Sequence, residues 1–149
     1  MKRFTFYFLF RCLIGVALAT STPPVSLEVR VKSADHVFIG IATGFQLLDQ
    51  SGSRPVSTPD TKQIGLTYYI TVRPVEVLKS TLQTLPPSLI VTNSHQMLVT
   101  PESERERFIG KKLVYFLSGT NFVPVNAYQF TEALDSLTNI TRLIQSEKK

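Results

Sequence analysis

Hydrophobic and polar residues alternate most regularly from Leu66 to Arg73. One side of this stretch carries the apolar residues Leu66, Tyr68, Ile70 and Val72. The intervening positions carry Thr67, Tyr69, Thr71 and Arg73. A period of two predicts a β-strand with one buried face. Beyond Pro74 the apolar residues move to odd numbers, Val75 and Val77, as one extra residue at a bulge would cause. The pattern therefore predicts one long strand that bends near Pro74.

Further segments have strand patterns. The stretch from His36 to Leu48 is apolar on both faces, and Gly40 and Gly44 suit a strongly curved strand that omits side chains at the bend. A short strand is predicted at Leu89 to Thr92, after a stiff Leu-Pro-Pro sequence. A buried strand from Lys111 to Leu117 is expected to pair with Phe122 to Asn126 across a turn. These patterns predict a mainly β fold, a small barrel of about five or six strands.

Helices are predicted at both ends of the domain. Ser26 can cap a short helix that ends near Ala34, although the alternation of apolar residues from Val25 to Val31 equally suits a strand. Near the C-terminus, Thr131 and Glu132 open a helix that is expected to pack on the barrel. Its apolar residues recur at helical spacing at Leu134, Leu137, Ile140 and Ile144. Two polar segments, Asp49 to Ile64 and Asn93 to Ile109, are predicted to be loops.

The first 19 residues have the layout of a secretory signal peptide. Basic residues Lys2, Arg3 and Arg11 precede a short apolar region, Cys12 to Ala19, which closes on an A-x-A cleavage site. Eight apolar residues are too few to span a bilayer, which needs about 20. We therefore expect cleavage after Ala19, export to the periplasm or the medium, and no stable membrane insertion of the mature chain. Without cleavage, the segment would anchor the protein to the membrane. Lipidation at Cys12 is disfavoured because bulky residues precede it.

The mature chain is expected to be one nearly neutral domain. Removal of 19 of the 149 residues leaves 130, from Thr20 to Lys149, enough for a single core. The net charge of the whole chain is +5, but three of its 16 basic residues lie in the signal, so 13 basic and 11 acidic residues leave +2. The charged stretch from Glu102 to Lys112 alternates its signs, which predicts a solvated loop and argues against a nucleic-acid partner. The only cysteine lies in the signal, so no disulfide is expected.

Three segments of the chain resemble a known superfamily. They are Ser33 to Gly40, Tyr69 to Val72 leading to Glu76 to Lys79, and Gly110 to Leu117. The set is similar to exported bacterial domains related to the tissue inhibitors of metalloproteinases and the netrin modules. The resemblance implies an OB-type barrel over most of the mature chain, and it bears on fold more than on activity. Those inhibitors chelate the zinc of the protease through an N-terminal cysteine. Thr20 or Ser21 would come first here, so that mechanism is not implied.

Candidate catalytic groups are few. His95 follows Asn93 and Ser94 in a segment that is predicted to be a loop, which suggests a Ser94 nucleophile with a His95 base. Neighbouring residues rarely face each other productively, however, and no G-x-S-x-G elbow supports the pair. The two histidines, His36 and His95, lack the spacing of metal ligands, and the mature chain has no thiol. We therefore expect no metal and no cofactor.

The sequence favours a binding module over an enzyme, because long polar loops on a rigid barrel offer recognition surface without converging catalytic groups. We predict an exported, non-catalytic module that binds or inhibits a protein through Arg54, Asn93 and His95. One alternative is an envelope hydrolase that uses His95 with Ser94 or a carboxylate. Another is a binder of glycans or single-stranded nucleic acid. Its rings on the barrel face would come from Tyr68, Tyr69, Tyr115, Phe122 and Tyr128.

Overall fold

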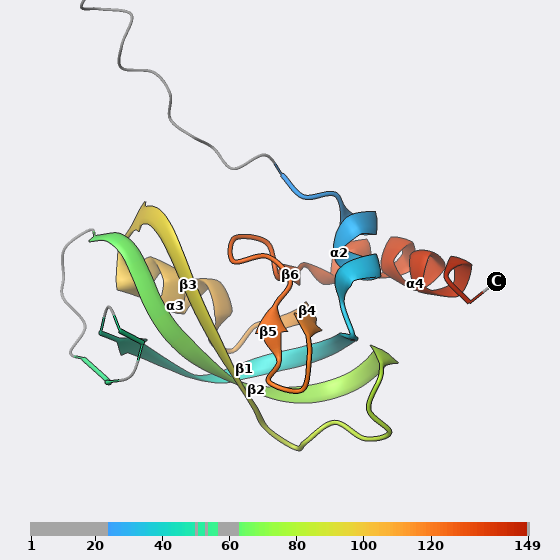
Figure 1. Ribbon diagram of the computed structural model, residues 1–149, viewed down its shortest axis with the longest axis horizontal. Coiled ribbons are helices and arrows are strands. Elements are labelled where there is room, and N and C mark those ends of the chain that lie inside the picture. The colour runs from blue at the N-terminus through green and yellow to red at the C-terminus, as the bar shows by residue number, and fades with distance from the viewer. Residues whose placement is uncertain (1–23, 50, 53, 57–62, 149) are drawn as a thin grey trace, which may run out of the picture.

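The computed structural model describes residues 24–148 except 50, 53 and 57–62 (Figure 1). Its strands are β1 (His36–Leu48), β2 (Gln63–Ser80), β3 (Leu89–Val99), β4 (Lys112–Ser118), β5 (Val123–Pro124) and β6 (Thr131–Glu132). Its helices are α2 (Leu27–Ser33), α3 (Pro101–Phe108), the 3-10 turn η1 (Leu134–Ser136) and α4 (Leu137–Ser146). The prediction of a mainly β fold with a short N-terminal helix and a C-terminal helix is confirmed. The predicted signal, residues 1–19, lies outside the described residues.

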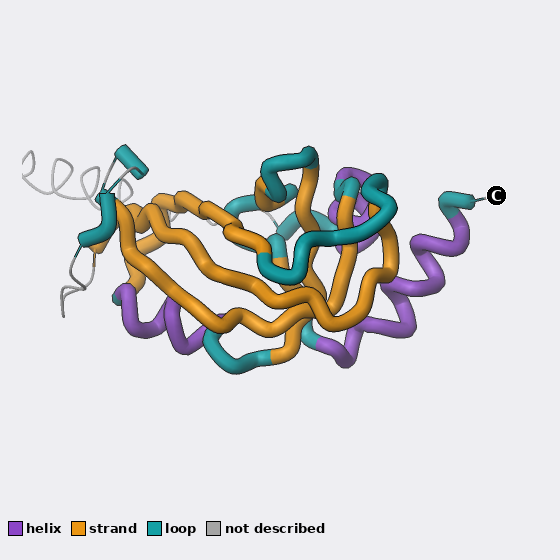
Figure 2. Tube along the Cα trace, turned by 90° about the horizontal axis from the view of Figure 1, so that it is seen from below, coloured by secondary structure: helices purple, strands orange, loops and turns teal. Residues whose placement is uncertain are grey.

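The six strands form one antiparallel sheet in the order β3-β2-β1-β4-β5, with β6 paired to β4. The sheet curves along its two longest strands, β1 and β2, as Figure 2 shows, with α3 beside one end and α4 beside the other. Over the described residues no backbone ladder joins β3 to β5. The predicted barrel is therefore barrel-like, an open sheet with a gap between its first and last strands.

Glycine and bulges produce the bend of β1 and β2. A Cβ on Gly40 would lie 2.7 Å from Cγ1 of Val72, so only glycine lets the two strands approach this closely. The register between them shifts at three points, where Thr43, Val75 and Leu78 have no opposite residue. Each such bulge increases the local bend and twist. The bulge predicted beside Pro74 is thus present, but Val75 and Val77 do not continue the buried face, because they are 45% and 49% exposed.

The sheet buries two clusters of apolar side chains, one on each face. The inner cluster lies in the concave side and includes Phe38, Tyr68, Ile70, Val72, Leu89, Phe108, Tyr115 and Phe130. The outer cluster lies between the sheet and helices α2 and α4, and includes Val31, Val37, Ile39, Val114, Phe116, Ile140 and Ile144. Alternate residues of β1 and β4 therefore enter different clusters, which explains why both strands are apolar on both faces.

Helix α2 is fixed to the sheet by a buried arginine. The Ser26 side chain accepts a hydrogen bond from the Val29 amide and caps the helix, as the sequence predicted. Arg30 is only 7% exposed, and its Nη2 donates to Glu132 Oε2 over 2.6 Å. Its guanidinium also lies 5.2 Å from the centre of the Phe116 ring. The pairing of Arg30 with Glu132 and neighbouring carbonyls holds residues 131–132 in strand β6, where the sequence had predicted the start of the last helix.

The largest departure from the predicted elements lies between residues 93 and 109. The strand predicted to end at Thr92 continues to Val99, and the predicted loop beyond it contains helix α3. Thr100 caps this helix by accepting from the Ser103 amide, and Pro101 occupies its first turn. The alternating charges of this stretch form pairs along the helix, including Glu102 with Arg105 at 3.2 Å. Among the described residues, no helix is both long and apolar enough to cross a membrane.

Candidate functional site

A group of polar side chains lies buried beside the inner cluster, where β3, α3 and residues 126–130 meet. Asn93, His95 and Glu104 are 4%, 3% and 5% exposed. The Tyr68 hydroxyl donates to Glu104 Oε2 over 3.0 Å and accepts from Asn93 Nδ2 over 2.9 Å. His95 Nε2 lies 3.5 Å from the same carboxylate oxygen, and its ring meets that of Tyr68 edge to face at 5.9 Å. We call these four residues, together with the half-buried Arg107 beside them, the buried polar cluster.

The buried polar cluster spans the gap in the sheet. Asn93 Nδ2 also donates to the Ala127 carbonyl over 2.9 Å. Arg107 Nη2 donates to the Tyr128 carbonyl over 2.9 Å, and its Nη1 lies 3.7 Å from Glu104 Oε1. The backbone amide of Gln96 donates to the Tyr128 hydroxyl over 3.4 Å. Side chains therefore replace the missing backbone ladder between β3 and residues 126–130, a line that we call the seam.

Glu104 keeps its negative charge although it is buried. Burial by itself would raise the pKa of Glu104. The contact with His95, the cationic Arg107 and the hydrogen bond from Tyr68 outweigh burial and hold that pKa below its ordinary value of 4.5. Burial, followed by the nearby Glu104 charge, raises the pKa of Tyr68 far above its usual range, so this hydroxyl stays protonated and acts as a donor. The cluster thus contains one ionised carboxylate with donors around it.

The structure separates the sequence-predicted site residues. Arg54 is exposed, and its amide and carbonyl both bind Asp49, which folds the chain into a compact turn. Asn93 and His95 lie in β3, not in a loop, and their side chains are buried. That location corrects the predicted loop, and the role of the two residues as partner contacts stays a prediction. Arg54 as a partner contact stays a prediction.

The predicted pair of Ser94 and His95 does not form. Successive residues of a strand point to opposite faces. Ser94 is accordingly exposed, and its Oγ lies 3.0 Å from Oγ1 of Thr67 on the outer face. The alternative of a carboxylate near His95 is met by Glu104, but both groups are buried. The geometry therefore places the two groups in contact inside the fold, 3.5 Å apart, and the hydrolase alternative stays a prediction.

The predicted platform of aromatic rings is also divided between faces. Tyr68 and Tyr115 are completely buried in the inner cluster. Phe122 packs against the same cluster and lies 5.1 Å from the ring of His36, while Tyr128 faces His95 at 6.0 Å. These rings stabilise the core and the seam. Tyr69 alone of the five lies on the outer face, as its alternation with Tyr68 predicted.

His36 has a structural position at the start of β1. Its Nδ1 lies 3.0 Å from Ser80 Oγ, and its Nε2 lies 3.2 Å from the carbonyl oxygen of Gly119. The preceding Asp35 accepts a hydrogen bond from the Gly119 amide over 2.7 Å. Because a carbonyl only accepts, Nε2 carries a proton, and in the neutral imidazole Nδ1 then accepts from the serine. The two residues tie β1 to the ends of β2 and β4.

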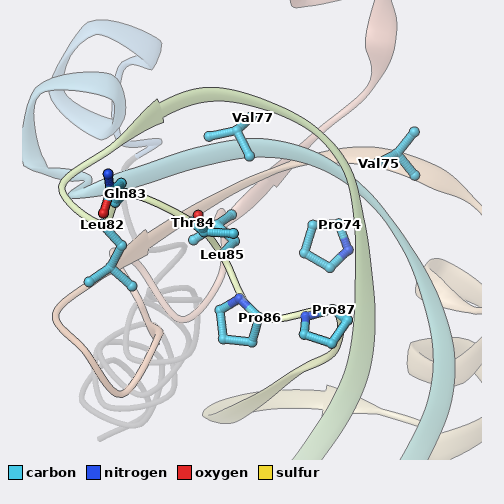
Figure 3. Close-up of a pocket in the computed structure, with 9 residues that line it drawn as sticks. All are labelled: Pro74, Val75, Val77, Leu82, Gln83, Thr84, Leu85, Pro86 and Pro87. Atoms are coloured by element: carbon cyan, nitrogen blue, oxygen red, sulfur yellow. The ribbon is translucent and has the colours of Figure 1, made fainter.

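An apolar groove lies on the surface beside the second half of β2 (Figure 3). It has a volume of about 280 Å³ and is lined by Pro74, Val75, Val77, Leu82, Gln83, Thr84, Leu85, Pro86 and Pro87. None of these side chains is charged. Leu85 belongs to the inner cluster and Leu82 packs against it, so the floor of the groove is continuous with the core. From Arg73 to Ser80, β2 pairs with β1 alone among the described strands, which leaves its other edge to the groove.

Sequence reasoning missed the buried polar cluster because it ended β3 too early. Burial alternates without interruption from Leu89 to Gln96, so a period of two was present through the polar residues. The sequence Thr100-Pro101-Glu102 is also a helix-start signal, with a capping residue, proline in the first turn and an acidic residue after it. These two signals would have placed Glu104 on a helix facing a strand that bears Asn93 and His95.

Neither a protein-family model nor a curated protein sequence matches this chain. Within the described ranges, no three histidine, cysteine, aspartate or glutamate side chains gather as metal ligands would. The resemblance to inhibitor-like OB domains therefore stays a prediction.

Proposed function

We propose that this chain is an exported, non-catalytic binding module, and that its groove receives an apolar segment of a partner protein. The observation that carries the proposal is the uncharged groove beside β2, with Val75 and Val77 about half exposed at its edge. Exposed valines on a strand next to an apolar depression are typical of an interaction surface. The groove thus takes the recognition role that the sequence assigned to polar loops.

The size of the groove supports a side-chain anchor as its occupant. At about 280 Å³, it falls at the lower limit of pockets for small molecules, which hold roughly 300–1,000 Å³. An apolar side chain or two from a polypeptide would fill it. Addition of a whole strand is disfavoured, because Pro74 lacks an amide hydrogen and the bulges at Val75 and Leu78 interrupt the edge. We therefore propose an extended segment that binds mainly through its apolar side chains.

The position of the acid and base groups supports a non-catalytic role. A general base must reach the proton that it abstracts. His95 and Glu104 are each at most 5% exposed, and the hydrogen bonds around Glu104 connect elements of the fold. The hydrolase alternative retains the proximity of these two residues as its support. It would require an opening through which substrate reaches them.

The test is a selection of binding peptides with the mature chain, Thr20 to Lys149. A displayed library of random peptides serves as the probe, and binders are compared on two variants. Val77→Asp places a charge at the edge of the groove. Ile90→Asp is the matched control, because Ile90 is 62% exposed in a strand and does not line the groove. We expect the selected peptides to share apolar residues and to lose at least about tenfold in affinity on Val77→Asp alone, because charge in an apolar site is costly.

Equal binding to both variants would refute the groove as the recognition site. Failure to select any peptide would count against a polypeptide partner altogether. Circular dichroism of both variants must match that of the unsubstituted chain, since a folding defect would also remove binding. A photo-crosslinking residue placed at position 77 then tests whether full-length proteins of an envelope extract bind at the groove. The same residue at position 90 is the control, and we expect crosslinks from position 77 alone.

A further inference from the structure

The seam joins two parts of the sheet with side-chain contacts in place of a ladder. β3 pairs with β2 only, and β5 contributes two residues, which pair with β4. The contacts across the seam are those of Asn93 with Ala127, of Arg107 with the Tyr128 carbonyl and of the Gln96 amide with the Tyr128 hydroxyl. A few such bonds are easier to break together than a ladder, because each ladder bond is supported by its neighbours. The seam is therefore the weakest closure of the sheet.

Glu104 is connected to two of the seam contacts, to that of Arg107 directly and to that of Asn93 through the Tyr68 hydroxyl. It faces Tyr68 from β2, His95 from β3 and Arg107 from its own helix, and Arg107 in turn holds Tyr128. Glu104 is the only carboxylate in the buried polar cluster. Loss of its charge would remove the negative charge that faces the half-buried Arg107, the buried ring of His95 and the Tyr68 hydroxyl. Hydrogen bonds to an ionised group are roughly twice as strong as those between neutral groups, so protonation of Glu104 weakens these contacts.

We propose that the seam is an acid-sensitive latch: when Glu104 is protonated, β3 and residues 126–130 separate while the rest of the sheet stays paired. The separation is local, because β1 keeps its long ladder with β2 and its shorter one with β4. It would expose aromatic side chains of the inner cluster, including Phe108 and Phe130, which stack at 5.5 Å beneath the seam. The lowered pKa of Glu104 keeps the latch closed at neutral pH.

The first test is hydrogen exchange at neutral pH on two glutamine variants of the mature chain. Glu104→Gln imitates the protonated carboxyl with little change in shape. Glu102→Gln is the matched control, because Glu102 lies on the same helix in an exposed pair with Arg105. We expect the backbone amide of Gln96 and the amides of residues 126–130 to exchange at least about tenfold faster in Glu104→Gln than in the unsubstituted chain, as the loss of charge-assisted hydrogen bonds implies. The β3 amides that bond to β2 should stay protected, because that ladder does not open. Amides of β1 and β4 should be unaffected, and Glu102→Gln should match the unsubstituted chain.

Two outcomes of this exchange experiment would overturn the latch. Unchanged exchange at the seam would show that Glu104 does not hold it. Equal acceleration in every strand would show global destabilisation instead of local opening. A second measurement uses the unsubstituted chain, so it does not depend on a variant that folds. On acidification from pH 7 to about pH 3.5, a dye that binds exposed apolar surface should bind before the far-ultraviolet strand signal is lost. Coincidence of the two transitions would also contradict the proposal.

Discussion

At the scale of single residues, burial gives polar side chains a meaning that their position in the sequence does not reveal. Asn93 sits in a polar stretch, yet its side chain reaches both Tyr68 and Ala127 in the interior. Arg54 sits in a similarly polar stretch and is exposed. A buried donor whose partners remain is costly to remove, because those partners are then left unsatisfied. The two residues, paired in the sequence prediction, should thus respond differently to the same substitution.

Asn93→Ala should lower the free energy of unfolding by about 1–3 kcal/mol, since it leaves the Ala127 carbonyl and the Tyr68 hydroxyl without a donor. Arg54→Ala should change it by less than about 0.5 kcal/mol, as is usual for a surface side chain. Urea unfolding followed by circular dichroism measures both. A neutral Asn93→Ala would mean that the amide does not hold the seam.

At the scale of elements, the spacing of residues predicted helices and strands correctly where the inward positions were apolar. β1 has the predicted bounds, His36–Leu48, and the stripe of the last helix enters the outer cluster as expected. The alternation of apolar and polar residues did not reveal the full strand where the inward positions were polar, as in β3. It also failed to distinguish the two faces of β2 beyond Pro74, because the apolar residues there line a groove instead of the core. Hydrophobicity marks a side chain that avoids water, and it does not say whether its own chain or a partner covers it.

Helix α4 should depend on one fully buried side chain. Ile140 is 0% exposed in the outer cluster, so Ile140→Ala should lower the free energy of unfolding by about 2–5 kcal/mol, the usual cost of such a cavity. Val29→Ala on helix α2 is a control, because Val29 is 52% exposed. Thermal unfolding compares the two variants. Equal shifts of the melting temperature would contradict the packing of α4 on the sheet.

At the scale of the whole molecule, two layers of apolar side chains and one open edge define the architecture. The outer cluster fixes both helices near the termini of the domain, as Figure 1 shows for α2 and α4. The inner cluster is closed on one side by α3 and the buried polar cluster, and it reaches the surface at the groove. Conditions that change the charge of Glu104 therefore act on the closure of the sheet.

Stability should decrease at acid pH in a way that depends on Glu104. Its pKa is lower in the folded protein than the ordinary 4.5, so the unfolded chain binds that proton more readily. The ionised carboxylate thus stabilises the fold above about pH 4.5, and this contribution is lost as the pH falls through the lowered pKa. We expect urea unfolding between pH 7 and pH 3 to give a higher free energy of unfolding for the unsubstituted chain than for Glu104→Gln. This difference in free energy should become smaller below pH 4.5. A constant difference would argue against this assignment, and Glu102→Gln should follow the unsubstituted chain throughout.

The sequence by itself determined the β-rich class, the curved strand β1 and the bulge beside Pro74, and it offered the helix capped by Ser26 as one of two alternatives. Each follows from local rules: alternation, the missing side chain of glycine, the missing amide hydrogen of proline, and a hydroxyl that caps amides. Only the tertiary structure decided the rest. Tyr68 and residues 127–128 reach the polar side chains of β3 and α3 because segments distant in the chain curl toward one another. The groove exists because β3 begins opposite Val72 and leaves the second half of β2 unpaired on that side. Contacts between distant segments depend on how the sheet closes, and no local pattern encodes that closure.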